Sequence, residues 1–104
     1  MWNELSFIVK KASVLVRIIM LDGTATGWSK SLIVPTDGYA ETPGFGPFRT
    51  LDAQCVEIDV MQKQRLGRLL PERLVDRSED IELALKNAGL YYERDGAILR
   101  IVCK

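Results

Sequence analysis

The chain has 104 residues, 47% of them hydrophobic and 27% charged, and this composition predicts a single globular domain over residues 1–104 that builds its core without disulfides or metals. Its 14 basic and 14 acidic residues cancel, so the overall charge does not favour a nucleic acid or an anionic membrane as partner. The sequence has no histidine, which excludes serine–histidine and cysteine–histidine catalytic pairs and every metal site with a histidine ligand.

The cysteines Cys55 and Cys103 are too few for a disulfide framework or a four-thiolate zinc site. Both lie in strand-like runs, which favours buried thiols over a bridge. The N-terminus lacks the basic region of a secretory signal, and the longest apolar stretch, residues 14–21, is interrupted by Arg17 and too short to span a membrane. We therefore expect a cytoplasmic protein with no membrane contact, no metal and no cofactor.

Hydrophobic periodicity defines the first third of the chain. Apolar residues at three- and four-residue spacing predict a helix over residues 2–12. A β-branched and aliphatic run predicts a buried strand over residues 13–21. Asp22-Gly23 is a strong hairpin signal, so residues 24–34 are expected to return as a second strand.

The middle of the chain changes character twice. Residues 35–50 combine prolines, glycines and aromatic residues, which predicts a loop with fixed turns. Residues 56–60 alternate apolar and acidic side chains, which predicts a half-buried strand that exposes Glu57 and Asp59 to water. These two acids share one strand face and could serve hydrolysis in a cleft, but a solvated edge is the favoured interpretation.

Residues 61–77 predict helix, broken into two short pieces at Pro71. The apolar stripe of this expected helix consists of Leu66, Leu69, Leu70, Leu74 and Val75. Ser78 is a good N-cap for a further helix that Gly89 would end. Residues 90–103 then predict a closing hairpin around Asp95-Gly96.

No catalytic motif is present. The string Met20–Thr24 resembles part of the haloacid dehalogenase phosphatase motif, but Met20 stands where that motif has its nucleophilic aspartate. We therefore interpret Asp22-Gly23 as a turn. Glycine loops that cradle phosphate are also missing from the sequence. We assign no catalytic and no metal-binding residue.

Two surface features are candidate binding sites. The first is a set of aromatic residues in or beside a stiff proline- and glycine-rich frame, where protein interfaces often find their anchors: Trp28, Tyr39, Phe45 and Phe48. The alternative is that Phe45 and Phe48 fold back as a lid over the core. Replacement of both by serine would separate the two interpretations.

The second feature is a charge asymmetry. Residues 62–77 hold five basic side chains against Glu72 and Asp76, whereas residues 37–59 hold five acids against Arg49. Such a contrast suits self-association or docking to a charged partner, and its basic side could also meet phosphates. A solvated helix face is the favoured alternative. The basic residues proposed for binding are Lys63, Arg65 and Arg68.

We expect an α+β fold: a single domain with a mostly antiparallel sheet of four to five strands, an N-terminal helix, two to three helices in the second half and a closing β-hairpin. The favoured function is a non-catalytic protein-interaction module, immunity-like or regulator-like, which uses the aromatic loop or forms a homodimer. A small-ligand-binding domain with the aromatic side chains lining a pocket is the alternative. An enzyme that depends on carboxylates or lysine is the third class, and we do not expect it.

Overall fold

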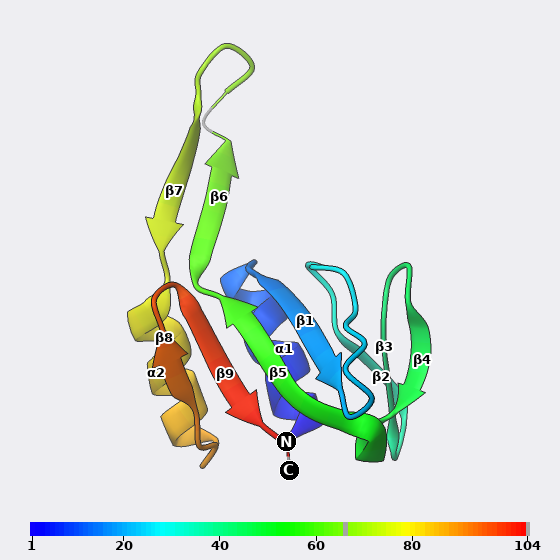
Figure 1. Ribbon diagram of the computed structural model, residues 1–104. Coiled ribbons are helices and arrows are strands. Elements are labelled where there is room, and N and C mark those ends of the chain that lie inside the picture. The colour runs from blue at the N-terminus through cyan, green and yellow to red at the C-terminus, as the bar shows by residue number, and fades with distance from the viewer. Residues whose placement is uncertain (66, 104) are drawn as a thin grey trace.

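The computed structural model describes residues 1–65 and 67–103 (Figure 1). The helices in these residues are α1 (Trp2–Ala12) and α2 (Ser78–Asn87), with a 3-10 turn at Thr50–Asp52. The strands are β1 (Leu15–Met20), β2 (Ile33–Thr36), β3 (Tyr39–Thr42), β4 (Gly46–Arg49), β5 (Ala53–Asp59), β6 (Met61–Arg65), β7 (Glu72–Asp76), β8 (Glu93–Asp95) and β9 (Ile98–Val102). The expected mixed α+β domain is confirmed, with a different division into elements.

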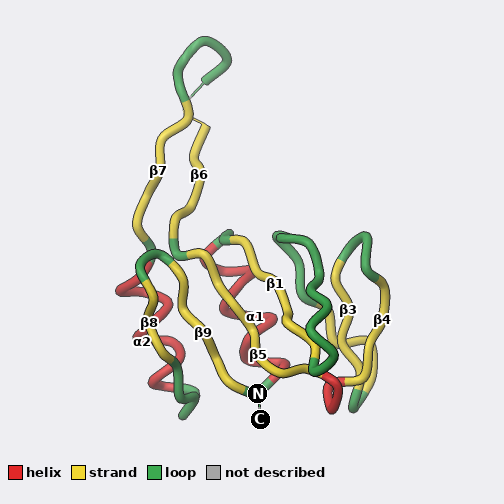
Figure 2. Tube along the Cα trace, viewed as in Figure 1, coloured by secondary structure: helices red, strands yellow, loops and turns green. Residues whose placement is uncertain are grey.

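The main sheet has four strands in the order β1-β5-β9-β8, and each neighbouring pair is antiparallel. Helices α1 and α2 lie against one face of this sheet, and no helix of the described residues covers its other face, which we call the open face (Figure 2). Successive residues of a strand point to opposite faces, so Val56 and Ile58 of β5 point into the core and Glu57 points to the open face.

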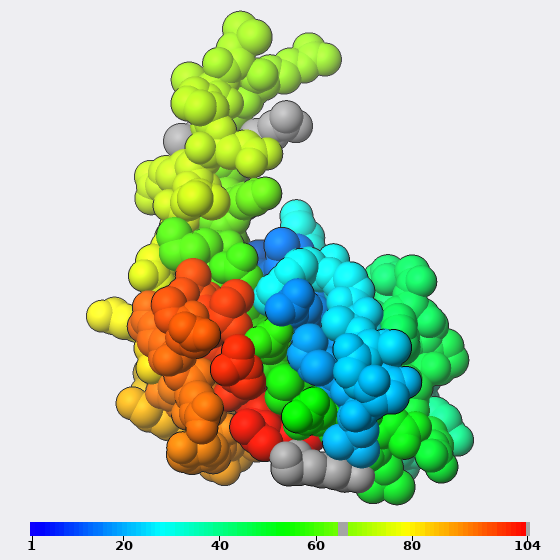
Figure 3. All heavy atoms as spheres, viewed as in Figure 1, coloured from blue at the N-terminus to red at the C-terminus, as the bar shows by residue number. Residues whose placement is uncertain are grey.

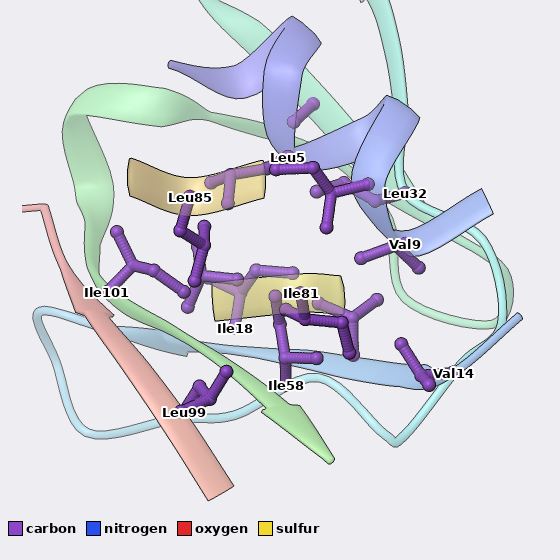
Figure 4. Close-up of a cluster of buried hydrophobic side chains, with 14 of the residues drawn as sticks. Leu5, Val9, Val14, Ile18, Leu32, Ile58, Ile81, Leu85, Leu99 and Ile101 are labelled. Carbon is purple, nitrogen blue, oxygen red and sulfur yellow. The ribbon is translucent and has the colours of Figure 1, made fainter. Parts of the chain in front are cut away.

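The core lies between the helices and the main sheet (Figure 4). Leu5 and Val9 come from α1 and Ile81 and Leu85 from α2. They meet alternate residues of β1, β5 and β9, including Ile18, Ile58, Leu99 and Ile101. Each such side chain stabilises the fold by about 1.5–3 kcal/mol when it is fully buried.

Residues 24–34 do not form the continuous strand predicted for them. Only two isolated bridges, Ile19 with Ala25 and Val16 with Ser29, attach this segment to β1. Between them the buried Thr26 hydroxyl oxygen accepts a hydrogen bond from the Ile18 amide. A side chain thus takes the place of a backbone partner, and the ladder is interrupted.

Residues 35–50 form strands rather than the predicted loop. Strands β2, β3 and β4 make a three-stranded antiparallel meander. Its turns are tight because Gly38 and Gly44 adopt positive φ values of 82° and 84°. Prolines predict a loop here, but Pro47 lies in the outer strand β4, where proline is tolerated.

Residues 61–77 contain no helix in their described part, which corrects the helical prediction. Strands β6 and β7 pair from Met61↔Asp76 to Arg65↔Glu72 and form a hairpin that leaves the body of the molecule (Figures 1 and 3). We call residues 61–76 the arm. The second half of the described chain therefore has one α-helix instead of two to three.

The end of the chain follows its prediction closely. Helix α2 occupies the expected position, Gly89 follows it with a positive φ of 71°, and β8 and β9 form the closing hairpin. The cap differs from the one expected, because the Ser78 amide donates a hydrogen bond to the Asp76 side chain at 2.8 Å. Ser78 is therefore the first residue of α2 rather than its N-cap, and Asp76 satisfies its amide.

Candidate functional site

A row of charged side chains crosses the open face of the main sheet. Arg17 on β1, Glu57 on β5 and Arg100 on β9 occupy directly opposed register positions. Arg17 Nε donates to Glu57 Oε1 at 2.7 Å, and Arg100 Nη2 donates to Glu57 Oε2 at 2.9 Å. Glu57 itself is only 5% exposed, which corrects the expectation that it faces water.

The two guanidinium groups keep the Glu57 carboxylate ionised. Burial alone would raise the pKa of Glu57, but hydrogen bonds from Arg17 and Arg100 outweigh this effect, so the pKa lies below its ordinary value. The pKa of Arg100 is raised in turn by its hydrogen bonds to Glu57. The row is thus a structural ion cluster, and the ionised Glu57 carries no proton that it could donate in a reaction at neutral pH.

Trp28 belongs to this same face. The Arg17 guanidinium lies 4.7 Å from the centre of the Trp28 ring, within the range of a cation–π contact. The contact explains why Trp28 is held over the sheet although its own segment has only bridge pairing. It also places Trp28 apart from the other aromatic residues of the candidate loop.

Phe45 and Phe48 make the second aromatic group. Their ring centres are 6.0 Å apart, and Phe48 also meets Trp2 of α1 edge-on at 5.9 Å. Phe48 is 7% exposed and belongs to the core, as the lid interpretation expects, whereas Phe45 is 42% exposed. A hollow of about 310 Å³ lies beside them against the Asp22-Gly23 turn, and Trp28 is not among its lining residues. Tyr39, in the neighbouring strand β3, is exposed.

The other acidic side chains near the body of the molecule, Asp59 and Asp80, are engaged in structural contacts. Asp59 accepts a hydrogen bond from the Met61 amide at 3.0 Å, so it shapes the junction of β5 and β6. Asp80 lies 3.4 Å from Arg77 as an ion pair at the start of α2. Among the described residues, no cluster of three carboxylate or cysteine side chains is close enough to hold a metal ion.

The arm is anchored firmly at its base. The Arg77 amide donates to the Val60 carbonyl and the Val60 amide to the Ala97 carbonyl, both at 2.9 Å. Asp59 and Asp76 add side-chain bonds to the backbone where the arm leaves and rejoins the body. These bonds tie the direction of the arm to the main sheet and to α2.

Beyond this base the described residues of the arm form no core of their own. Leu69 at its tip is 97% exposed, and Leu70 and Leu74 are more than half exposed. Lys63 and Arg68 are also exposed, so the structure places two of the three proposed basic residues on the arm surface. Arg65 ends β6, and its side chain lies outside the described part of the chain, as does Leu66. The exposed leucines were not identified from the sequence, where they counted as a helix stripe.

An apolar groove begins close to the base of the arm. It lies between α1 and α2, has a volume of about 400 Å³ and is lined by Phe7, Ile8, Lys11, Ala12, Arg77, Asp80, Ile81, Leu83, Ala84 and Asn87. A second hollow of about 490 Å³ extends it along the helix pair and shares four lining residues with it: Phe7, Ile8, Ala84 and Asn87. Phe7 and Leu83 are both more than half exposed at this groove.

These features define a class of protein: a mixed α+β domain with a projecting β-hairpin arm, an ion cluster on the open face of its main sheet, and an apolar groove between its two helices. The chain belongs to a family of unknown function, DUF6678, whose model matches residues 1–103. No curated protein and no solved structure matches the chain. No helix in the described residues is long and apolar enough to cross a bilayer.

Proposed function

We propose that this protein is a non-catalytic protein-interaction module of the cytoplasm and that the arm is its contact surface. The observation that carries the proposal is the arm itself, which displays Leu69, Leu70 and Leu74 on a two-stranded hairpin outside the core. The aromatic loop proposed from the sequence is a weaker candidate, because Phe48 is part of the core and Trp28 lies on the sheet face.

The physical argument concerns stability. An isolated two-stranded hairpin is marginal in water, because it buries little apolar surface and leaves backbone groups unpaired along both outer edges. The arm likewise buries little apolar surface, since Lys63, Leu74 and Arg73 are exposed on its paired strands. Exposed apolar side chains gathered on a projecting element mark protein-interaction sites. A bound partner would bury the apolar side chains that the two-stranded arm leaves exposed.

The composition of the arm favours a protein over a nucleic acid. Leucine side chains gain nothing from phosphates, whereas Glu72 and Asp76 repel them. Glu72 and Asp76 stand at opposite ends of the paired part of β7, so no long stretch of the strand is purely basic. The exposed arginine and lysine side chains instead suit the rim of a protein interface.

Site-specific photo-crosslinking in living cells tests this function. A photoreactive phenylalanine derivative at position 69 is expected to give a discrete crosslinked protein band. The same derivative at position 91, where the natural Tyr91 is exposed on the body, serves as the control and is expected to give none. If position 69 crosslinks to no protein, or only as diffusely as position 91, the arm is not a protein-binding surface.

A further inference from the structure

We infer that the arm's partner is a second copy of this chain, and that the tip leucine Leu69 of each copy enters the α1–α2 groove of the other. The inference rests on the proposed function and names the partner. It joins two unpartnered apolar surfaces of the same chain: the leucines of the arm and the groove beside Phe7 and Leu83.

The two surfaces lie at opposite ends of one element. Arg77, which follows β7 directly, is a lining residue of the groove, so the groove starts at the base of the arm. Leu69 lies at the tip, beyond five paired positions. At about 3.3 Å per residue these positions span roughly 17 Å. Because the arm leads away from the body, Leu69 cannot fill the groove of its own chain (Figure 3).

A twofold axis between two copies gives a partner both to the leucines of the arm and to the groove. When two arms lie side by side in opposite directions, the tip of each reaches the base of the other, where the partner's groove begins. Every contact then occurs twice, as an isologous dimer requires. A different partner would have to supply a separate receptor for the leucines and a separate ligand for the groove.

The size of the surfaces fits this arrangement, and the arm and the rest of the chain differ in overall charge. The arm and the ten lining residues of the groove together come to about 25 residues per copy, and stable interfaces use roughly 20–30 residues a side. Residues 61–76 hold four basic and two acidic side chains in a chain whose net charge is zero, so the remainder of each copy is net negative. This contrast does not extend to the groove itself, which Lys11 and Arg77 line beside Asp80, so the contact with the tip rests on apolar side chains.

Sedimentation velocity of the purified chain, over a concentration range, is the test. The wild type is expected to be a dimer that dissociates on dilution. Leu69→Asp at the tip and Leu83→Asp at the groove each break both contacts of the dimer and should raise its dissociation constant by at least about 100-fold, since buried hot-spot side chains dominate interface affinity. Leu21→Asp, the same change at an exposed leucine of the body, is the matched control and should leave the constant unchanged.

Mixing the two variants distinguishes an arm–groove contact from any other dimer. Leu69→Asp retains an intact groove and Leu83→Asp retains an intact arm, so the mixed dimer recovers one of its two contacts. The mixture is expected to associate at least about 10-fold more tightly than either variant alone. Circular dichroism of each variant checks that the exposed substitutions leave the fold intact.

Each alternative result has a definite meaning. A wild-type monomer at all concentrations overturns the inference, and so does a dimer that Leu69→Asp leaves intact or that mixing fails to restore. A monomer whose position 69 still crosslinks to another protein in cells overturns the inference but retains the proposed function. A monomer that binds a duplex oligonucleotide in a salt-dependent way through the arm overturns both.

Discussion

Glu57 lies on the middle strand of three, and its carboxylate receives hydrogen bonds from Arg17 on one side and Arg100 on the other. A carboxylate that is 5% exposed would be costly without such partners. The arginine side chains are about one-third exposed, so water screens part of the attraction and the cluster contributes less than a fully buried one. We therefore expect a moderate contribution to stability.

The first prediction concerns removal of this charge. Glu57→Gln leaves two guanidinium groups without their anion and should lower the free energy of unfolding by about 2 kcal/mol at neutral pH. Urea denaturation measures the difference. Glu93→Gln, at an exposed position opposite Arg100 on β8, is the control and should change stability by less than about 0.5 kcal/mol. Equal effects of the two substitutions would contradict the role given to Glu57.

The second prediction is the pH dependence of that difference. The pKa of Glu57 is lower in the folded chain than its ordinary value of 4.5, so its contribution is fully present above that value and is lost as the pH falls through the folded pKa. The stability gap between wild type and Glu57→Gln should therefore be constant near neutral pH and close in acid. A gap that widens in acid would mean that the carboxylate does not stabilise the fold by its charge.

The third prediction separates Phe48 from Phe45. Phe48→Ala removes a buried ring and should cost about 3–5 kcal/mol, as large core truncations do. Phe45→Ala removes a partly exposed ring and one edge-on contact and should cost about 1 kcal/mol. Thermal unfolding of the two variants measures the ratio of their losses of stability. Comparable losses would show that Phe45 is as much a part of the core as Phe48.

At the scale of elements, the sequence predicts the helices and strands that pack one face against the core. Residues 2–12 and α2 bury one stripe each, and β9 follows a glycine turn, so periodicity and turn chemistry locate all three. The alternation of residues 56–60 predicts β5 but not the burial of Glu57. That burial depends on Arg17 and Arg100, which are distant in sequence and come opposite only through strand register.

The arm illustrates the opposite case. Apart from Met61 at its base, no described residue of the arm packs on the core, so no apolar face imposes a period of two along the arm. The leucine spacing matches a helix by coincidence. Gly67 and Pro71 were the available signals: they flank the tip of the hairpin, and a short segment that contains glycine between two runs is a hairpin pattern. This pattern places the exposed leucines in a turn and in the strand that follows it.

The fourth prediction is that the arm is dispensable for folding. Replacement of residues 63–74 by Asn-Gly keeps the Gln62↔Val75 pair and closes it with a favourable two-residue turn. Because none of the deleted described residues belongs to the core, the shortened chain should unfold cooperatively, with a Tm within about 5 °C of the dilute wild type. Loss of cooperative unfolding would show that the arm is part of the folding unit.

At the scale of the whole molecule, self-association couples stability to concentration. A dimer that forms only from folded chains gains stability by mass action, so its apparent Tm rises with protein concentration. For two chains of this length, with an unfolding enthalpy of about 0.7 kcal/mol per residue, a hundredfold rise in concentration should raise the Tm by about 7 °C.

The fifth prediction applies this coupling to four chains. Wild type should show the concentration-dependent Tm by differential scanning calorimetry, whereas Leu69→Asp and the armless chain should show a constant Tm. Leu21→Asp should follow the wild type. The armless chain should match the dilute wild type, because what it loses is the contact between copies and not a contact within the core. A concentration dependence that persists without the arm would place the dimer contact on another surface, and the open face of the main sheet around Trp28 would then be the first to test.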